Sequence, residues 1–435
     1  MNASKFIHFG CWNNLNVKKG KPMGCLQSVS DKLHNYLRSD NLPDFMVVAG
    51  DNYYPMKEKK ENEQGEEDKQ KLISVDTMKQ GFELLPQNIP IIMLLGNHDL
   101  DTNGKKQSYF TMNDDGQLIS ESDCHIIKNE KRIIENMPNI SYTLFDSREL
   151  ANGTLMLLID TSIYLDGNAH FLPCYRHFSE RNWADIDEIK NAQQSFIVDT
   201  IRAYKDNHEL KNIILIGHHP ISGLKWNDEI KYDKQGNIKV NKGNYLMTDM
   251  IQMHPMLNTL YETAGENNVD YYYLCADLHM YQHGIINLTL DNGENMRIVQ
   301  HIAGTGGTKL DDDLDFSVNV PTDDGNGIVY EYIDHKMDCG FVECTIDDNQ
   351  PIQFIPIMLK SSVGGRSPKA PRPRRGATIR GRKNKMTNRK RKNKMTIIER
   401  IDKRTNKKRN NKRAIRMRTN KKAKRWRKTT LRNKL

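Results

Sequence analysis

The chain has 435 residues, with 65 Lys and Arg against 55 Asp and Glu, which gives a formal net charge of +10. This charge is unevenly divided. Residues 361–435 hold 32 basic residues and two acids, and the remaining 33 basic and 53 acidic residues give residues 1–360 a net charge of −20. The composition therefore excludes a uniformly basic nucleic-acid-binding domain. No apolar run reaches the roughly 18–20 residues that a membrane-spanning helix needs.

Short apolar runs alternate with helix-like stretches along most of the body. Runs of this length, bounded by Gly, Asp and Asn, are typical of buried strands. They predict strands at residues 6–9, 45–49, 90–95, 154–159, 212–216 and 271–275. Apolar side chains at helical spacing predict helices at 27–38 and 191–204. Four further strands are expected without helices between them, at 283–290, 296–303, 341–346 and 351–358. This order favours a layered α/β (α+β) domain with a mixed sheet over residues 1–360.

Three segments differ in composition from the rest. Residues 57–71 are almost entirely charged or amide and are expected to form an exposed insertion. Residues 361–376 resemble a Pro/Gly/Arg linker, and residues 377–435 form a basic low-complexity tail in which RKNKMT and RTNKK each occur twice. We expect this tail to be disordered alone and to bind nucleic acid or another polyanion. A nuclear address signal, an anionic membrane surface and docking on the acidic body remain alternatives.

The cysteines and the N-terminus bear on the compartment. The first residues, MNASKFIHFGCWNN, show no charged segment followed by an apolar one, so no secretory signal is expected. The seven cysteines are scattered and form no CxxC pair. We therefore expect reduced thiols in an intracellular protein of the cytoplasm or nucleus, or of a virion if the source is viral.

Polar side chains follow five of the predicted strands. The segments are GCWN at 10–13, GDNYY at 50–54, GNHD at 96–99, GHHP at 217–220 and ADLH at 276–279. In an open α/β sheet the loops at the carboxyl ends of the strands gather in one crevice. Oxygen and imidazole ligands gathered in this way suit Zn, Mn or Fe ions. The pattern therefore predicts a metal site with contributions from distant parts of the chain.

The chemistry of these residue types favours a two-metal site. Two cations about 3.5–4 Å apart need a bridging carboxylate, for which Asp51 is suited. Asn97 offers a neutral oxygen. His98 diverges from its neighbour and is better placed to protonate a leaving group. Asp99 is expected to hold the His98 ring in the correct tautomer.

GDNYY, GNHD and GHHP, in this order at strand ends, resemble the motifs of the calcineurin-like metallophosphoesterase superfamily. The tyrosine three residues after Asp51 is similar to that of the purple acid phosphatase (tartrate-resistant type) branch. The resemblance covers about residues 5–310. It implies a four-layer β-sandwich flanked by helices and a binuclear metal-dependent hydrolase. In such an enzyme a hydroxide that bridges the metals attacks phosphomonoesters.

The resemblance also implies a role for each matching residue. The iron would be held by Cys11, Asp51, Tyr54 and His279, and a second ion (Zn, Mn or Fe) by Asp51, Asn97, His218 and Asp277. His98 would protonate the leaving group, and His219 would contact the substrate.

Two of these ligands depart from the family pattern. Cys11 occupies the place of an aspartate, and Asp277 occupies that of a histidine. Both residues can still bind metal, and a thiolate at Cys11 would favour Zn or Fe over Mn. The alternative is a degenerate pseudo-phosphatase that acts as a scaffold or packages nucleic acid through its tail.

Overall fold

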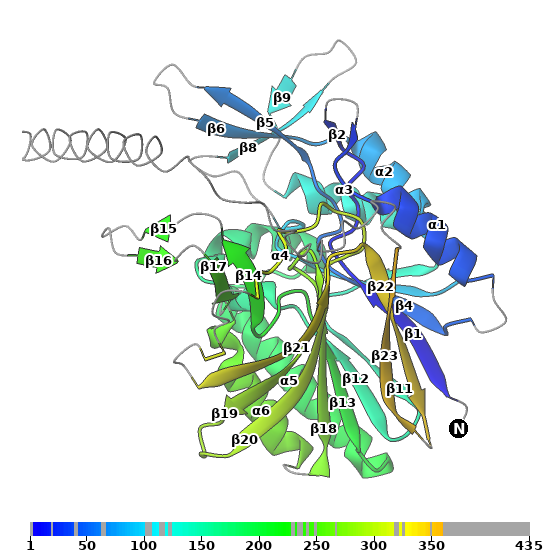
Figure 1. Ribbon diagram of the computed structural model, residues 1–435, viewed down its shortest axis with the longest axis vertical. Coiled ribbons are helices and arrows are strands. Elements are labelled where there is room, and N and C mark those ends of the chain that lie inside the picture. The colour runs from blue at the N-terminus through cyan, green and yellow to red at the C-terminus, as the bar shows by residue number, and fades with distance from the viewer. Residues whose placement is uncertain are drawn as a thin grey trace, which may run out of the picture. The chain divides into compact units, whose positions relative to one another are not determined.

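Two β-sheets packed face to face form the centre of the fold (Figure 1). The computed structural model describes residues 3–18, 21–38, 42–61, 67–100, 107–112, 118–120, 124–227, 231–232, 238–240, 243–247, 250–265, 268–316, 322–323, 327–348 and 350–359. These residues all belong to one unit, Met1–Gly364. The predicted linker at 361–376 and basic tail at 377–435 lie outside the described residues.

Both sheets are mixed. The first runs in the order β10 (Ile140–Tyr142), β7 (Ile91–Leu94), β4 (Phe45–Ala49), β1 (Ser4–Phe9), β22 (Gly340–Asp347) and β23 (Gln350–Met358). The second runs in the order β11 (Asp146–Leu150), β12 (Thr154–Leu158), β13 (Asn212–Ile216), β18 (Asp270–Cys275), β20 (Asn295–Ala303), β19 (Tyr281–Thr289) and β21 (Ile328–Lys336). Strands β10, β7, β4 and β1 pair in parallel, as do β12, β13, β18 and β20. All ten predicted strands are confirmed, each within two residues at either end.

Successive side chains of each strand belong to different layers of the hydrophobic core. In β4, Phe45, Val47 and Ala49 belong to the cluster of side chains between the two sheets. Met46 and Val48 point the other way and pack with the helices. Because successive side chains point to opposite faces of a strand, an almost wholly apolar run serves two core layers at once.

Helices cover both outer faces. The first sheet is covered by α1 (Leu26–Tyr36), α2 (Val75–Glu83) and α3 (His125–Ile134). The second is covered by α4 (Leu172–Ser179), α5 (Ile186–Asn207) and α6 (His254–Ala264). The predicted four-layer architecture is thus confirmed (Figure 1). Of these six helices, α1 and α5 were predicted from the sequence and the other four were missed. None of the helices within the described ranges is long and apolar enough to cross a membrane.

The charged segment at 57–71, which was expected to be an exposed insertion, forms strands. Its backbone pairs as an antiparallel hairpin of β5 (Met56–Glu61) and β6 (Glu67–Leu72). The pairing extends to β8 (Gln107–Met112) and β9 (Leu118–Ser120), and Lys71 is buried. Hairpin pairing satisfies the backbone groups of such a segment whatever its side chains are. Smaller elements are β2 (Val17–Lys18), β3 (Lys21–Pro22), β14 (Gly223–Asn227), β15 (Lys231–Tyr232), β16 (Ile238–Val240), β17 (Gly243–Met247) and 3₁₀ turns at Ser162–Tyr164, Asn168–Phe171 and Ile251–Met253.

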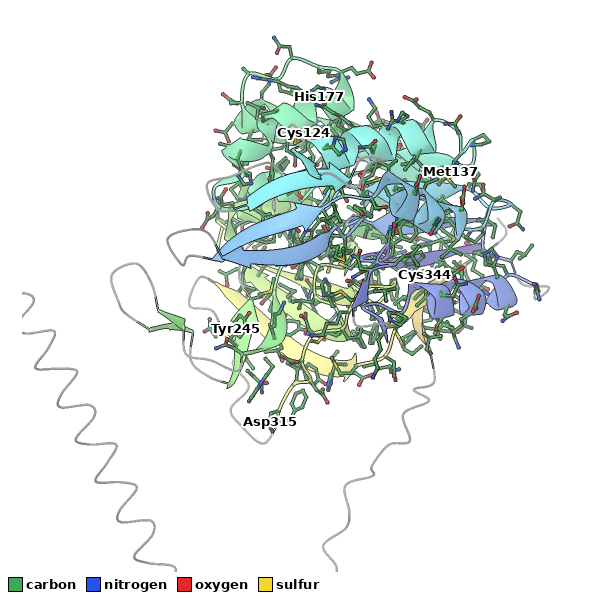
Figure 2. All side chains as sticks on the ribbon, turned by 90° about the horizontal axis from the view of Figure 1, so that it is seen from above. Cys124, Met137, His177, Tyr245, Asp315 and Cys344 are labelled. Carbon is green, nitrogen blue, oxygen red and sulfur yellow. A yellow bond between two sulfur atoms is a disulfide. The ribbon has the colours of Figure 1, made fainter. Side chains whose placement is uncertain are left out.

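The expectation of reduced thiols is wrong for four cysteines. Disulfides join Cys25 to Cys339 and Cys124 (labelled in Figure 2) to Cys174. The paired residues are 314 and 50 positions apart, so only the fold reveals the pairing. Cys11, Cys275 and Cys344 are buried free thiols. Disulfides persist mainly in oxidising environments, so the intracellular expectation loses the support that it drew from the cysteines.

Candidate metal centre

The strand ends bring the predicted ligands together. Cys11 follows β1, Asp51 follows β4, and Asn97 follows β7. From the second sheet, His218 follows β13, and Asp277 and His279 follow β18. These parallel strands all end at the same edge of the sandwich, which is where the loops of such sheets converge.

The carboxylate of Asp51 lies at the centre of this group, and its two oxygens face different neighbours. The Tyr54 hydroxyl donates to Asp51 Oδ2 at 2.6 Å, and Cys11 Sγ lies 3.9 Å from the same oxygen. On the other side, His218 Nε2 lies 3.2 Å from Asp51 Oδ1, and the backbone N–H of His98 donates to it at 3.0 Å. The single carboxylate therefore links two sets of side chains, as a bridging ligand does.

Two glycines make room for this carboxylate. Gly50 has a positive φ of +80°, and a Cβ there would lie 2.7 Å from Nδ1 of His218. A Cβ on Gly96 would lie 2.3 Å from both the backbone N and Oδ1 of Asp51. The GD and GN pairs of the sequence motifs are thus explained by close packing around Asp51.

Three candidate ligands have left-handed backbone conformations. The φ angles of Cys11, Asp51 and Asp277 are 53°, 54° and 48°. Such angles are uncommon outside glycine, and they concentrate at sites where a side chain must be aimed against local preference. Cys11 and Asp277, the two residues that depart from the family pattern, thus share the unusual backbone of Asp51.

The donor atoms form two groups within the described residues. Those of Cys11, Asp51 and His279 lie within 4.8 Å of one another, and so do those of His218, His219 and Asp277. The Tyr54 hydroxyl lies 3.2 Å from His279 Nε2, next to the first group. Asn97 Oδ1 lies 3.2 Å from His219 Nε2, next to the second.

His218 shows that these residues suit a cation. Its Nδ1 lies 2.6 Å from the carbonyl oxygen of Ala49 and therefore carries the proton that this bond requires. In the neutral ring, Nε2 then presents a lone pair to the carboxylates of Asp51 at 3.2 Å and Asp277 at 3.7 Å. This nitrogen is fully buried and has no hydrogen-bond partner. Lone pairs facing one another in a buried site repel, so a proton or a metal ion belongs between them.

The ionisable side chains of the site shift one another's pKa values. Burial disfavours the charged forms, but His218 and His98 outweigh it and hold the pKa of Asp51 well below its usual range. In turn, the two carboxylates overcome burial and raise the pKa of His218 to about 9. Burial and the Asp51 charge raise the pKa of Cys11 and Tyr54 well above their ordinary values. With no metal present, the centre thus holds a proton on His218 and keeps Cys11 as a thiol.

His219, for which the sequence suggested a contact with the substrate, is buried and hydrogen-bonded to Thr161 and Asn97. The Thr161 hydroxyl oxygen accepts hydrogen bonds from the backbone N–H groups of His218 and His219, at 3.1 and 2.9 Å. Both of its lone pairs are then used, so its own proton points to His219 Nδ1 at 2.9 Å. His219 Nε2 therefore carries a proton and donates to Asn97 Oδ1. The hydrogen bonds thus assign His219 to orienting Asn97 rather than to binding a metal.

Asp99, which was expected to orient the His98 ring, makes several hydrogen bonds to the loops of the site. Its fully buried carboxylate accepts hydrogen bonds from Gly96 N, Asn52 N and Asn52 Nδ2, at 2.7 to 2.9 Å. Burial and the neighbouring Glu130 raise the pKa of Asp99 well above its usual value. Asp99 thus ties together the two loops that carry Asp51 and Asn97. Trp12 packs behind them, and its indole N–H donates to Asn52 Oδ1.

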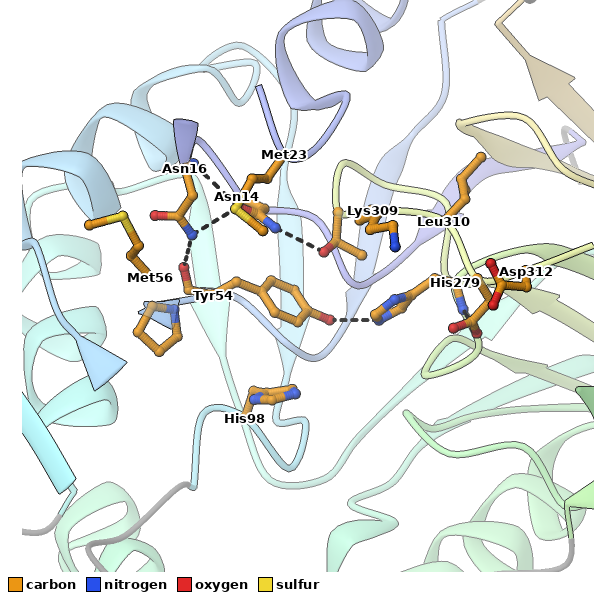
Figure 3. A pocket seen from close by; sticks show the side chains of 13 residues that line it. Asn14, Asn16, Met23, Tyr54, Met56, His98, His279, Lys309, Leu310 and Asp312 are labelled. Carbon is orange, nitrogen blue, oxygen red and sulfur yellow. Dashed lines mark hydrogen bonds between the residues drawn. The ribbon is translucent and has the colours of Figure 1, made fainter. Parts of the chain in front are cut away.

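A pocket of about 260 Å³ opens beside the first donor group (Figure 3). Tyr54, His98 and His279 line it on the side of Asp51, and the Tyr54 and His98 rings lie 5.0 Å apart. Lys309 and Asp311 also line the pocket, and Asp311 lies next to His279, from whose backbone N–H it accepts a hydrogen bond.

Sequence reasoning missed several residues around this centre. Thr161 and Asn52 orient ligands, and Asp311 binds the backbone N–H of His279 at 3.0 Å and pairs with Lys225 at 3.2 Å. Asn52 lies inside the GDNYY motif, which could have marked it. Thr161 and Asp311 carry no comparable signal, because their partners are distant in the sequence.

Comparison with known proteins identifies the family of this chain. The model of the calcineurin-like phosphoesterase family matches residues 4–281, more than half of the chain. No curated protein matches the sequence. Among solved structures, one described as "Structure of PhoD" matches with a TM-score of 0.42 and 13% identity. That match covers 80% of this chain and 64% of the other. The chain belongs to the calcineurin-like phosphoesterase family.

Proposed function

We propose that this calcineurin-like phosphoesterase hydrolyses phosphomonoesters at a centre of two metal ions. The observation that carries the proposal is the position of Asp51, whose oxygens face one donor group each. When bound, two divalent cations supply a nucleophile from water near neutral pH and neutralise the charge of the phosphate. Cys11, Asp51, Tyr54 and His279 would hold one ion, and Asp51, Asn97, His218 and Asp277 the other.

The remaining residues would orient the substrate and move a proton. His98 lines the pocket beside Tyr54 and His279, so its ring is placed to protonate a leaving oxygen. Lys309 would attract the phosphate to the opening. The volume of about 260 Å³ favours a small ester. The acidic wall residue Asp311 and the net charge of the body would disfavour polyanionic substrates.

Within the family, we propose a relationship to the purple acid phosphatase branch. Its support is Tyr54, whose hydroxyl contacts Asp51 Oδ2 and His279 Nε2 together. In that branch the corresponding tyrosine is an iron ligand. The two substituted ligands, Cys11 and Asp277, keep donor atoms at their positions, which favours a working centre over the degenerate one.

The experiment measures metal content and hydrolysis of p-nitrophenyl phosphate by the full chain, after loading with Zn²⁺, Mn²⁺ or Fe²⁺. We expect two ions per chain and turnover that is lost in Asp51→Asn. The variant Asp199→Asn, which makes the same change at an exposed position of α5, serves as the matched control and keeps activity. A chain that binds no metal and shows no turnover would refute the proposal and favour the scaffold.

The basic tail supports a second, separate proposal. Residues 377–435 lie outside the described structure, but their cation density favours binding to a polyanion such as nucleic acid. The test compares the affinity for duplex DNA, and its salt dependence, between the full chain and a chain that ends at residue 360. Equal affinities and equal salt slopes would contradict it.

A further inference from the structure

The two donor groups around Asp51 differ in chemical softness. On the side of Asp51 Oδ2 lie a sulfur, Cys11 Sγ at 3.9 Å, the Tyr54 hydroxyl at 2.6 Å and the imidazole of His279. On the side of Oδ1 lie His218 Nε2 at 3.2 Å and the carboxylate of Asp277. The bridging carboxylate thus separates a donor set that contains a thiol from one that consists of oxygen and imidazole.

Softness decides which ions each set prefers. Thiolate ligands select thiophilic ions such as Zn²⁺, whereas carboxylate and amide oxygens suit Mn²⁺ and Mg²⁺. The second set gains an amide oxygen from Asn97, which lies 3.2 Å from the neighbouring His219. It also has two carboxylates, because Asp277 and Asp51 both face His218 Nε2.

We propose that the centre sorts its two metal ions, with a thiophilic ion bound through Cys11 and a harder ion on the side of Asp277. This inference rests on the proposed function, since it requires the same residues to bind metal. On binding, the S–H bond of Cys11 breaks, a sulfur–metal bond forms and the proton passes to solvent. Neither the sulfur nor the metal changes its oxidation state.

The burial of Cys11 fits this role. Its side chain is fully buried, so solvent does not compete for the sulfur. It is one of three free cysteines, together with Cys275 and Cys344. Cys275 Sγ points to the carbonyl oxygen of His301 at 3.8 Å. Cys344 lies in the core between the sheets. Cys11 is therefore the free thiol that shares a group of donor atoms with Asp51 and His279.

The test is a cobalt titration of the metal-stripped full chain, followed by absorption spectroscopy and measurement of bound metal. We expect a near-ultraviolet thiolate-to-cobalt band that grows with the first equivalent of Co²⁺ and is complete at one ion per chain. A second equivalent of Co²⁺ should bind without increasing the intensity of this band. One equivalent of Zn²⁺ added with excess Mn²⁺ should give a chain with one ion of each.

Three variants make the result specific. Cys11→Ser should lose the band and weaken binding of the first ion by at least the roughly 10–100-fold seen when a residue that only supports a metal ligand is removed. Cys11→Asp should bind two ions without the band, which shows that the fold survives the change. Cys344→Ser, which alters another buried thiol, should keep the band.

The outcomes separate this inference from the proposed function. Two bound cobalt ions without a thiolate band would overturn the sorting and leave the binuclear centre intact. A band that persists in Cys11→Ser would also overturn it. Absence of bound metal would instead refute the proposed function.

Discussion

His219 Nε2 lies 3.2 Å from Asn97 Oδ1, and the hydroxyl of Thr161 fixes the direction of this hydrogen bond. Because Thr161 donates to Nδ1, the proton of the neutral ring sits on Nε2. The amide of Asn97 must then present its oxygen to His219, since its NH₂ group would repel another donor. A neutral histidine thus keeps the oxygen of Asn97 turned toward the centre.

The first prediction concerns His219. His219→Ala should retain two ions per chain but lower kcat by about 10–100-fold, because Asn97 loses the donor that orients it. His219→Gln should recover much of kcat, since its amide NH₂ can replace the Nε2–H group. Steady-state kinetics with measurement of bound metal checks both. Loss of one ion per chain in His219→Ala would show that His219 is itself a ligand.

The second prediction concerns the glycine beside Asp51. In Gly96→Ala the new Cβ would lie 2.3 Å from the backbone N and Oδ1 of Asp51, neither of which can move freely. We expect a loss of about 1–3 kcal/mol in unfolding free energy, as overpacking causes, together with weaker metal binding. Denaturant unfolding and metal titration measure the two effects.

Gly167→Ala is the control for this variant. Gly167 also has a positive φ, of +74°, but nothing lies within 4 Å of its Cβ position. It should lose a modest amount of stability through backbone strain and keep its metal affinity. Equal metal affinities in the two variants would contradict the packing role of Gly96.

The sequence was enough to predict that Asp51 and His218 lie close together. Each follows a parallel strand, and residues at the carboxyl ends of parallel strands lie at the same edge of the sheet. The sequence could not predict the role of Thr161, whose hydroxyl acts on residues 57 and 58 positions away. It also could not predict that Asn52 and Gly96 donate hydrogen bonds to Asp99, because Asn52 is distant from it in the sequence. The core strands could be predicted because their apolar runs are continuous. The hairpin of β5 and β6 could not, because it depends on backbone pairing, which amino-acid composition does not reveal.

The third prediction follows from the disulfides. Alkylation of the denatured, unreduced chain should label three thiols, Cys11, Cys275 and Cys344, and reduction should expose all seven. The double variant Cys25→Ala, Cys339→Ala should lose about 2–5 kcal/mol of unfolding free energy, because the disulfide restricts the unfolded chain over a long loop. Mass spectrometry and denaturant unfolding check these results. Seven labelled thiols before reduction would refute the pairing.

The last prediction concerns the buried histidine of β1. His8 is fully buried; its Nε2 donates to the carbonyl oxygen of Cys275 at 3.0 Å, and its Nδ1 has no hydrogen-bond partner. Protonation of Nδ1 would place an uncompensated charge between the sheets, and burial accordingly lowers the pKa of His8 to about 4.

Between pH 6.5 and pH 4 the His8 side chain is therefore protonated in the unfolded chain but remains neutral in the folded chain. The contribution of His8 to the unfolding free energy is complete above pH 6.5. It decreases as the pH is lowered, by roughly 3 kcal/mol at pH 4. His8→Gln keeps a donor for Cys275 but cannot titrate, so its stability should fall less steeply over the same range. Denaturant unfolding at several pH values compares the two proteins. Parallel curves would show that His8 does not account for the loss of stability in acid.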